Sequence, residues 1–223
     1  MNEIQKTKAT YDLFAKEYEE KTKQYVEKYL QFDFDLFLKS IKGKRILDIG
    51  SGPGRDSSLF KQKGFFPVCI DNSPAMISLC KKKGLEAYEM DMEHLTFEPA
   101  SFDGIWAYTS LLHIPKSRVK QTLENIAHIL TNDGIFYMGM KEGVFDGMKE
   151  DARYSGYGRY FAQYTKEELE LLLSELFEII HFSRVEINPE QIYLNFMCKK
   201  KKMVDMSECH SCVPRTVKID LLL

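Results

Sequence analysis

Three glycines follow an apolar segment near residue 50 in a pattern that could hold a ligand. In the segment ILDIGSGPGRDSSLF, Gly50, Gly52 and Gly54 stand after an apolar run and before a helical pattern. Glycines after a first strand let the backbone approach a ligand closely at the carboxyl edge of a parallel sheet. The pattern is typical of nucleotide and nucleoside sites, although Arg55 stands where a dinucleotide motif would carry its third glycine.

Carboxylates follow three successive apolar segments: Asp48, Asp71 and Asp91. An acidic residue after a second strand can accept hydrogen bonds from both hydroxyls of a ribose. Asp48 is so near the glycine loop that it would repel a pyrophosphate, whereas it can hold a cationic amino group directly or through water. These residues predict a nucleoside ligand with a positively charged, phosphate-free group. The alternative is that Asp48 only pairs with Arg45 or Arg55.

One histidine follows the fourth predicted strand, at the edge where a substrate would meet this ligand. His113 could act there as a general base or as a hydrogen-bond partner of the substrate, because the usual histidine pKa of about 6.5 suits either role. It could equally anchor the turn before Pro115. The sequence leaves these alternatives open.

Cations and aromatic side chains gather between the fifth predicted strand and the helix that follows it. Such a mixture suits an anionic or aromatic substrate beneath a lid, but the tyrosines could also simply pack on the domain. Our candidates for substrate contact are Arg153, Arg159 and Tyr160 from this segment, with Tyr18 from the N-terminal part of the chain.

The cysteines give no strong metal or disulfide pattern. Their number is five, and most lie in apolar or helical surroundings, which indicates reduced thiols. The run from Cys209 to Cys212 encloses His210, but a single CxxC lacks the second pair of ligands that a closed zinc site needs. We therefore expect no metal site.

These residues must be positioned by the elements around them. Apolar segments alternate with amphipathic helical patterns from residue 45 to about 130, which predicts a parallel sheet covered on both faces. Helices are expected to begin at Pro115 and at Thr165, whose hydroxyl with Glu168 fits a capping box. Strands are expected at 45–49, 66–70, 86–90, 102–108 and 134–140, and a closing antiparallel pair at 177–187 and 191–200.

Two regions lie outside this alternation and are candidate lids over the site. One is the N-terminal helical segment 10–40, and the other is the Gly- and Tyr-rich insertion 141–164. We expect one domain over residues 1–200, followed by a C-terminal extension at 201–223 that shows neither clean periodicity nor a clear strand.

From about residue 11 to residue 200, the chain resembles the class I S-adenosylmethionine-dependent methyltransferases, in particular small-molecule members. The resemblance rests on ILDIGSGPG, CIDNSPAMI, EMDMEHL, FDGIWAYTSLLHIP and LTNDGIFYMGM, which stand in the family's order and spacing, and on YDLFAKEY near the N-terminus. It implies an α/β fold, a Rossmann-like three-layer sandwich whose seven-stranded, mostly parallel sheet has an antiparallel last strand. It also implies S-adenosylmethionine as cofactor and S-adenosylhomocysteine as product.

The resemblance further implies roles for individual residues. The glycine loop would face the amino-acid end of the cofactor, Asp71 the ribose, and Asp91 with Met92 the adenine. The full set of cofactor candidates is Tyr11, Asp48, Gly50, Ser51, Gly52, Asp71, Asn72, Met76, Asp91 and Met92.

Composition limits the partners. The 223 residues carry a net charge of -2, which gives no basic field for nucleic acid, and no apolar run approaches the ~20 residues of a membrane span. We therefore expect a cytoplasmic protein that acts on a small molecule and not on DNA or membranes. We also expect it to be a monomer or a homodimer. The tetrad TSLL stands where enzymes that methylate DNA amines usually carry an NPPY-like motif. An RNA methyltransferase of the same fold, an NAD-binding oxidoreductase and a non-catalytic nucleoside-binding protein stay as alternatives.

Overall fold

One seven-stranded sheet forms the centre of the fold. The structure, a computed structural model, describes residues 2–150, 154 and 156–201. From edge to edge, the strand order is β3-β2-β1-β4-β5-β9-β8. The strands are β1 (Arg45–Ile49), β2 (Phe66–Asp71), β3 (Glu86–Glu89), β4 (Phe102–Tyr108), β5 (Leu130–Lys141), β8 (Phe177–Asn188) and β9 (Gln191–Lys200).

Strand directions confirm the expected fold class. β1 pairs in parallel with β2 and β4, and the pairs β2–β3 and β4–β5 are parallel as well. β9 runs antiparallel to both β5 and β8, so the predicted closing pair is confirmed. The strand order reverses between β1 and β4, and in parallel sheets this switch is where ligands bind, beyond the carboxyl ends of the strands.

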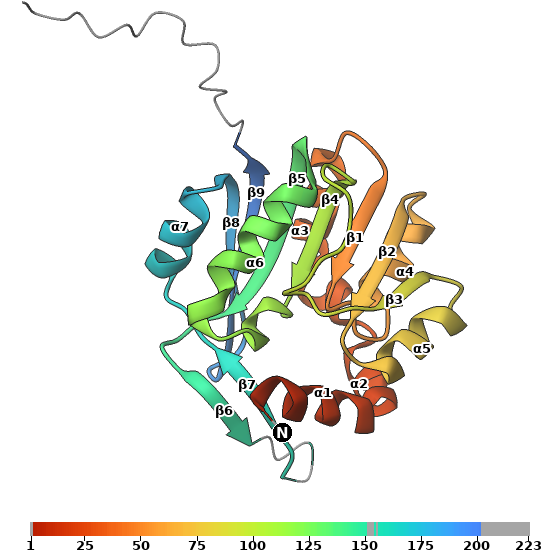
Figure 1. Ribbon diagram of the computed structural model, residues 1–223, viewed down its shortest axis with the longest axis vertical. Helices are drawn as coiled ribbons and strands as arrows, with labels where there is room; N and C mark the ends of the chain where they lie inside the picture. The colour runs from red at the N-terminus through yellow and green to blue at the C-terminus, as the bar shows by residue number, and fades with distance from the viewer. Residues whose placement is uncertain (1, 151–153, 155, 202–223) are drawn as a thin grey trace, which may run out of the picture.

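Helices cover both faces of the sheet (Figure 1). Along β1 the side chains alternate: Leu47 and Ile49 pack in one core with Leu123, whereas Ile46 packs in the other with Phe37. Within the described part of the chain, no helix has the length and apolar composition that a bilayer crossing demands. The helices that flank the sheet are α3 (Gln31–Ser40), α4 (Arg55–Gln62), α5 (Pro74–Lys82), α6 (Lys116–Ile129) and α7 (Lys166–Ser174).

The predicted cap of α7 is present, whereas strand β5 begins earlier than predicted. The capping box of α7 is present, because the Thr165 side chain accepts a hydrogen bond from the Glu168 N–H and the Glu168 carboxylate accepts one from the Thr165 N–H. β5 begins at residue 130 and not at 134 as predicted. Leu130 already pairs with Phe102 directly after α6 ends, and an irregularity in the pairing accommodates the polar residues that follow.

The N-terminal segment and the insertion lie at the same end of the sheet (Figure 1). The helical segment begins earlier than the predicted residue 10, with α1 (Glu3–Leu13) capped by Asn2, and continues through α2 (Ala15–Thr22) and a short π-helix (Val26–Leu30) to α3. The insertion contains an antiparallel hairpin that the sequence analysis did not predict. Its strands are β6 (Asp146–Glu150) and β7 (Gly158–Ala162).

A buried carboxylate on α3 joins this helix to strands β5 and β8. Asp33 is 4% exposed and accepts hydrogen bonds from the Tyr137 hydroxyl, at 2.7 Å, and from the Ser183 hydroxyl. His181 Nε2 lies 3.0 Å from the same carboxylate. His181, in strand β8, therefore has Asp33 as its partner.

Candidate functional site

A pocket opens at the carboxyl edge of the sheet, beside the ends of β1, β2 and β4. It encloses about 940 Å³, including solvent at its mouth. Helix α1 forms one side of it, so the pocket lies between the sheet edge and the N-terminal segment. Its lining includes all of the cofactor candidates as well as Tyr18 and His113: Tyr11, Asp48, Gly50, Ser51, Gly52, Asp71, Asn72, Met76, Asp91 and Met92.

The glycine loop has a backbone conformation that side chains rarely allow. Gly50 and Gly52 have φ angles of +66° and +53°. A Cβ added to Gly50 would lie 2.3 Å from the Cβ of Ser110, whereas one added to Gly52 would find its nearest neighbour, Tyr18, at 3.6 Å. Gly50 is therefore required for packing as well as for its φ angle, and the open side of Gly52 lets a ligand approach the backbone.

The carboxylate of Asp71 is held in place at the end of β2. It accepts hydrogen bonds from the backbone N–H of Gly52, at 2.9 Å, and from that of Ser73, at 2.8 Å. Burial raises the pKa of Asp71 to about 6, and the nearby Asp12 carboxylate acts in the same direction. An acceptor fixed in this way, with lone pairs left over, suits the paired hydroxyls of a ribose.

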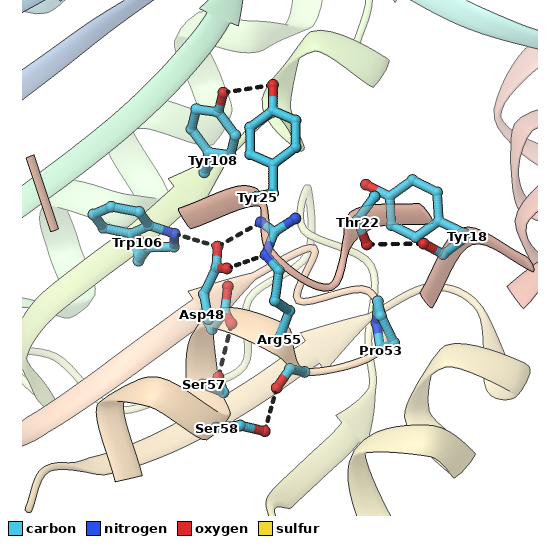
Figure 2. Close-up of polar contacts among 12 residues, drawn as sticks. Tyr18, Thr22, Tyr25, Asp48, Pro53, Arg55, Ser57, Ser58, Trp106 and Tyr108 are labelled. Atoms are coloured by element: carbon cyan, nitrogen blue, oxygen red, sulfur yellow. Dashed lines mark hydrogen bonds and ion pairs between the residues drawn. The ribbon is translucent and has the colours of Figure 1, made fainter. Parts of the chain in front are cut away.

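Asp48 lies beneath the loop and has few partners. It is 3% exposed, and the Ser57 hydroxyl donates a hydrogen bond to it at 2.7 Å, as Figure 2 shows. Burial raises the pKa of Asp48 well above its usual range, and the neighbouring Asp56 carboxylate adds to the effect. A cationic ligand group placed here would offset both contributions.

Arg55 does not form the ion pair with Asp48 that was the alternative to a ligand role for that carboxylate. Its guanidinium donates a hydrogen bond to Asp56 at 3.0 Å and lies beneath the Tyr25 ring, 5.2 Å from the ring centroid (Figure 2). Asp56 also accepts a hydrogen bond from Trp106 Nε1 at 2.9 Å. Arg55 therefore forms its ion pair with Asp56 and not with Asp48.

The third acid is less tightly held than the other two. Asp91 lies in the turn after β3, is half-buried, and accepts a hydrogen bond from the Glu93 N–H at 3.0 Å. Met92 follows it in the pocket wall, and its methyl group lies 3.5 Å from the position of an added Gly50 Cβ. An apolar side chain beside a carboxylate can contact a flat base while the acid accepts a hydrogen bond from its edge.

The turn after β4 contains two features that sequence reasoning passed over. Thr109 has a φ of +55°, which is rare for a β-branched residue and marks backbone strain. The hydroxyl of Ser110 is buried in the pocket wall and has no hydrogen-bond partner among the described residues. A buried hydroxyl without a partner is costly, so a ligand that bonds to it relieves the cost. The only sequence signal was the polar pair that begins the tetrad TSLL.

His113 is held by both of its ring nitrogens. Nε2 lies 2.8 Å from the Tyr11 hydroxyl, and Nδ1 lies 2.6 Å from the backbone oxygen of Tyr160. Burial lowers the pKa of His113 to about 3, and the positive charge of Arg159 acts in the same direction. The ring is thus neutral and its lone pair is already engaged, which favours an orienting contact over a general base.

The described substrate candidates divide into two groups, one in the pocket lining and one outside it. Tyr18 lines the pocket, and its ring packs edge-on against Tyr11 with centroids 5.5 Å apart. Arg159 and Tyr160 are buried in β7 outside the pocket lining, where Arg159 donates a hydrogen bond to the Tyr11 hydroxyl and Tyr160 donates one to Asp146.

Two sets of residues singled out in the sequence have no described position. Arg153 and the segment from Cys209 to Cys212 lie outside the described residues. Among the residues that are described, no group of three or more His, Cys, Asp and Glu side chains is arranged to hold a metal ion.

Sequence comparison finds a domain match and partial relatives. Residues 46–134 match a family model described as a methyltransferase domain. The ubiquinone biosynthesis O-methyltransferase of Xylella fastidiosa strain M23 is 29% identical over 106 residues, which cover 44% of this chain and 42% of that protein. The chain therefore spans less than half the length of the curated relatives that match first.

Structural comparison finds the same fold in solved structures. The 1,6-didemethyltoxoflavin-N1-methyltransferase of Burkholderia thailandensis, with bound 1,6-didemethyltoxoflavin and S-adenosylhomocysteine, matches with a TM-score of 0.63 and 22% identity over 76% of each chain. The complex of DhpI with SAH matches with a TM-score of 0.67 and 18% identity, over 89% of this chain and 97% of that one. At these identities, the likeness establishes the fold.

Proposed function

We propose that this chain, which carries a methyltransferase domain and has the fold of the class I S-adenosylmethionine-dependent methyltransferases, binds S-adenosylmethionine and transfers its methyl group to a small molecule. One observation carries the proposal: open glycine backbone, the carboxylates of Asp48 and Asp71, and the partnerless hydroxyl of Ser110 converge on one pocket. A loop with a carboxylate beneath it suits a cationic nucleoside better than a pyrophosphate.

Acidic residues at the ends of β1, β2 and β3 would each contact a different part of the cofactor: its amino group, its ribose and its adenine. Asp71, fixed by two backbone N–H groups, would accept hydrogen bonds from the ribose hydroxyls. Asp48 would balance the cationic amino group, directly or through water. Asp91 and Met92 would contact the adenine edge and face.

The chemistry asks little of the protein beyond alignment. S-adenosylmethionine, when bound, supplies a methyl group on a positively charged sulfonium, which is already a good leaving group. The pocket's role is to exclude water and to hold the acceptor in line with that methyl group. Tyr11 and Tyr18 from the N-terminal segment cover the pocket and fit this role. Neutral His113 would orient Tyr11 rather than remove a proton.

A small acceptor agrees with the charges around the pocket. The two cations in its described lining, Lys8 and Arg55, are already paired with Glu89 and Asp56. A polyanionic backbone such as RNA would need free cations at this mouth. The relatives named above include an O-methyltransferase of ubiquinone biosynthesis and an N1-methyltransferase solved with bound 1,6-didemethyltoxoflavin. We extend from them only the class of a small organic acceptor.

The proposal also includes the bounds of the catalytic domain and the cellular compartment. We place the catalytic domain at residues 1–200 and the protein in the cytoplasm. Cys69, Cys80 and Cys198 are buried free thiols, which suits a reducing compartment.

The proposal is tested by following a labelled methyl group. Purified protein is incubated with methyl-labelled S-adenosylmethionine and, separately, with small acceptors that carry a phenol, carboxylate, thiol or ring nitrogen, and with bulk transfer RNA. Label on a small acceptor, lost in Asp71→Ala, supports the proposal. Label on RNA alone favours the RNA alternative, and cofactor binding with no transfer to any acceptor favours a non-catalytic protein.

A further inference from the structure

A chain of hydrogen bonds beside the pocket begins and ends on strand β7. Arg159 Nη1 lies 2.7 Å from the Tyr11 hydroxyl oxygen, which lies 2.8 Å from His113 Nε2. His113 Nδ1 then lies 2.6 Å from the backbone oxygen of Tyr160, the residue next to Arg159. The chain therefore joins three parts of the molecule: the β6–β7 hairpin, helix α1 and the turn after β4.

The chemistry of the two ends fixes the direction of every bond. A guanidinium can only donate and a backbone carbonyl can only accept. The Tyr11 oxygen therefore accepts from Arg159, and its own proton is donated to His113 Nε2. His113 consequently carries its proton on Nδ1 and donates it to the Tyr160 oxygen. One tautomer of His113 satisfies all three bonds.

Arg159 is connected to the pocket through Tyr11. Its side chain is 5% exposed and does not line the pocket. The guanidinium carbon lies 5.3 Å from the Tyr11 ring centroid and 4.9 Å from those of Tyr154 and Phe161. A planar cation enclosed by rings has a fixed orientation, so its hydrogen bond to Tyr11 has a fixed direction.

Helix α1 makes two more bonds to the same strand. The Thr7 hydroxyl accepts from the backbone N–H of Tyr160 at 2.9 Å, and the Thr10 hydroxyl donates to the backbone oxygen of Gly158 at 2.9 Å. Both threonines are buried, and they lie one turn apart on the face of α1 that contacts β7. Arg159 adds a further contact between α1 and β7, and its partner Tyr11 lies in the pocket wall and is hydrogen-bonded onward to His113.

The other end of α1 lies against the ribose side of the pocket. Asp12 accepts hydrogen bonds from the Ser73 hydroxyl and, at 3.3 Å, from the Ala75 N–H at the start of α5. Ser73 in turn donates its backbone N–H to Asp71. Helix α1 therefore bridges the hairpin on one side and the Asp71 region on the other, across the mouth of the pocket.

We propose that Arg159 is a positioning residue: by its hydrogen bond to the Tyr11 hydroxyl it holds helix α1 over the pocket and directs the Tyr11 proton to His113 Nε2, so that strand β7 fixes this wall of the cofactor pocket. The part of this inference that concerns a bound cofactor rests on the proposed function. The part that concerns His113 rests on the hydrogen bonds alone.

Four variants separate positioning from packing. Arg159→Met fills the space among the aromatic rings but removes the charge and the donors, whereas Arg159→Lys keeps the charge and a donor. Tyr11→Phe keeps the ring and removes the hydroxyl. Lys149→Met is the matched control, because Lys149 lies directly opposite Arg159 in the hairpin and is exposed.

The first readout is the ¹⁵N NMR spectrum of His113, assigned with His113→Gln, in protein without any added ligand. Wild type and Lys149→Met should show one neutral tautomer with the proton on Nδ1, from pH 8 down to pH 5. Arg159→Met and Tyr11→Phe should keep the Nδ1 proton, which the Tyr160 oxygen accepts, but should shift the Nε2 resonance away from its hydrogen-bonded position, and Arg159→Lys should lie nearer to wild type than Arg159→Met does. A spectrum of Arg159→Met identical to wild type would overturn the proposal, whether or not any cofactor binds.

The second readout is the dissociation rate of S-adenosylhomocysteine, measured by stopped-flow competition. Arg159→Met and Tyr11→Phe should each speed dissociation by roughly tenfold, as expected for the loss of a charge-assisted hydrogen bond. The double variant should be no faster than the faster single variant, because both break the same chain. Multiplied effects in the double variant would mean that Arg159 acts independently of Tyr11, which contradicts the proposal. Absence of S-adenosylhomocysteine binding in wild type would instead refute the proposed function and leave the NMR result to decide this inference.

Discussion

The two sides of the pocket are built in different ways. The loop side comes from one stretch of chain, residues 48–92, and its acids lie at the carboxyl ends of three neighbouring strands. The closing side joins helix α1, the turn after β4 and strand β7. Its bonds connect side chains that are 102 and 148 positions apart, Tyr11 with His113 and Tyr11 with Arg159.

This difference teaches how each side should respond to change. On the loop side, backbone conformation and strand pairing set the geometry, so a single substitution alters several ligand contacts at once. On the closing side, each bond depends on at least one side chain, so a substitution removes the bonds of that side chain and leaves the backbone path of the site unchanged. The predictions below test that contrast, beginning with the largest expected effect.

The largest effect is expected at Gly50. Gly50→Ala should abolish measurable S-adenosylhomocysteine binding and lower the free energy of unfolding by roughly 2–5 kcal/mol, because it adds backbone strain and a clash with Ser110. Gly64→Ala is the control: Gly64 has a φ of +82°, but an added Cβ meets nothing within 4 Å. It should cost about 1–2 kcal/mol and leave binding intact. Equal binding by both variants would show that the loop does not form the site.

Asp71 tests whether the fixed carboxylate serves a ligand or only the fold. Asp71→Ala should weaken S-adenosylhomocysteine binding by roughly 1.5–3 kcal/mol in calorimetry, because hydrogen bonds to a charged group are lost. Asp103 is a matched control, since its carboxylate also accepts two backbone N–H bonds, from Lys44 and Arg45. Asp103→Ala should lower stability and leave affinity unchanged. If Asp71→Ala binds as tightly as wild type, the ribose assignment is wrong.

On the closing side, His113 should make the free energy of unfolding depend on pH. His113 has a pKa lowered to about 3 in the fold by burial and by Arg159, against about 6.5 when unfolded. The unfolded chain therefore binds the extra proton, so this contribution is fully present above pH 6.5 and is lost as pH falls toward 3, with a limiting slope of about 1.4 kcal/mol per pH unit.

Denaturant unfolding between pH 7 and pH 5 measures this slope. His113→Gln should remove it, whereas His94→Gln should keep it, because the His94 side chain is 82% exposed. An unchanged slope in His113→Gln would show that this histidine is not held neutral by the fold.

The smallest effect is expected at Ser110. Ser110→Ala removes a buried hydroxyl that has no protein partner, so stability should stay the same or rise slightly. If the hydroxyl bonds to the cofactor, affinity for S-adenosylhomocysteine should fall by roughly threefold to tenfold. Ser57→Ala is the contrasting variant: it deletes the bond to Asp48 and should lower stability. A clear loss of stability in Ser110→Ala would contradict this assignment.

The sequence predicted the loop side well because its signals are local. Glycines at fixed positions after an apolar strand, and an acid at the end of the next strand, specify a backbone path without reference to distant residues. The capping box at Thr165 is local in the same sense. The strand starts followed from the alternation of apolar segments and helical patterns, apart from the early start of β5, whereas the seven-stranded sheet was implied by the family resemblance.

The closing side could not be predicted in this way. Arg159 was expected to contact substrate, but it lies outside the pocket lining because Tyr11, which is 148 positions earlier in the chain, takes its hydrogen bond. The partners of His113 come from α1 and β7, and no periodicity relates those segments. Side-chain partners across such separations depend on how α1 and the hairpin pack, which local propensity does not specify.

The central claim is that the pocket binds S-adenosylmethionine, and one titration tests it directly. Purified protein is titrated with S-adenosylmethionine, S-adenosylhomocysteine and NAD while heat flow and thermal stability are recorded. Micromolar binding of the first two with a rise in Tm, and no binding of NAD, is the predicted result. Binding of NAD alone, or of none of the three, would contradict the account of the glycine loop and its carboxylates.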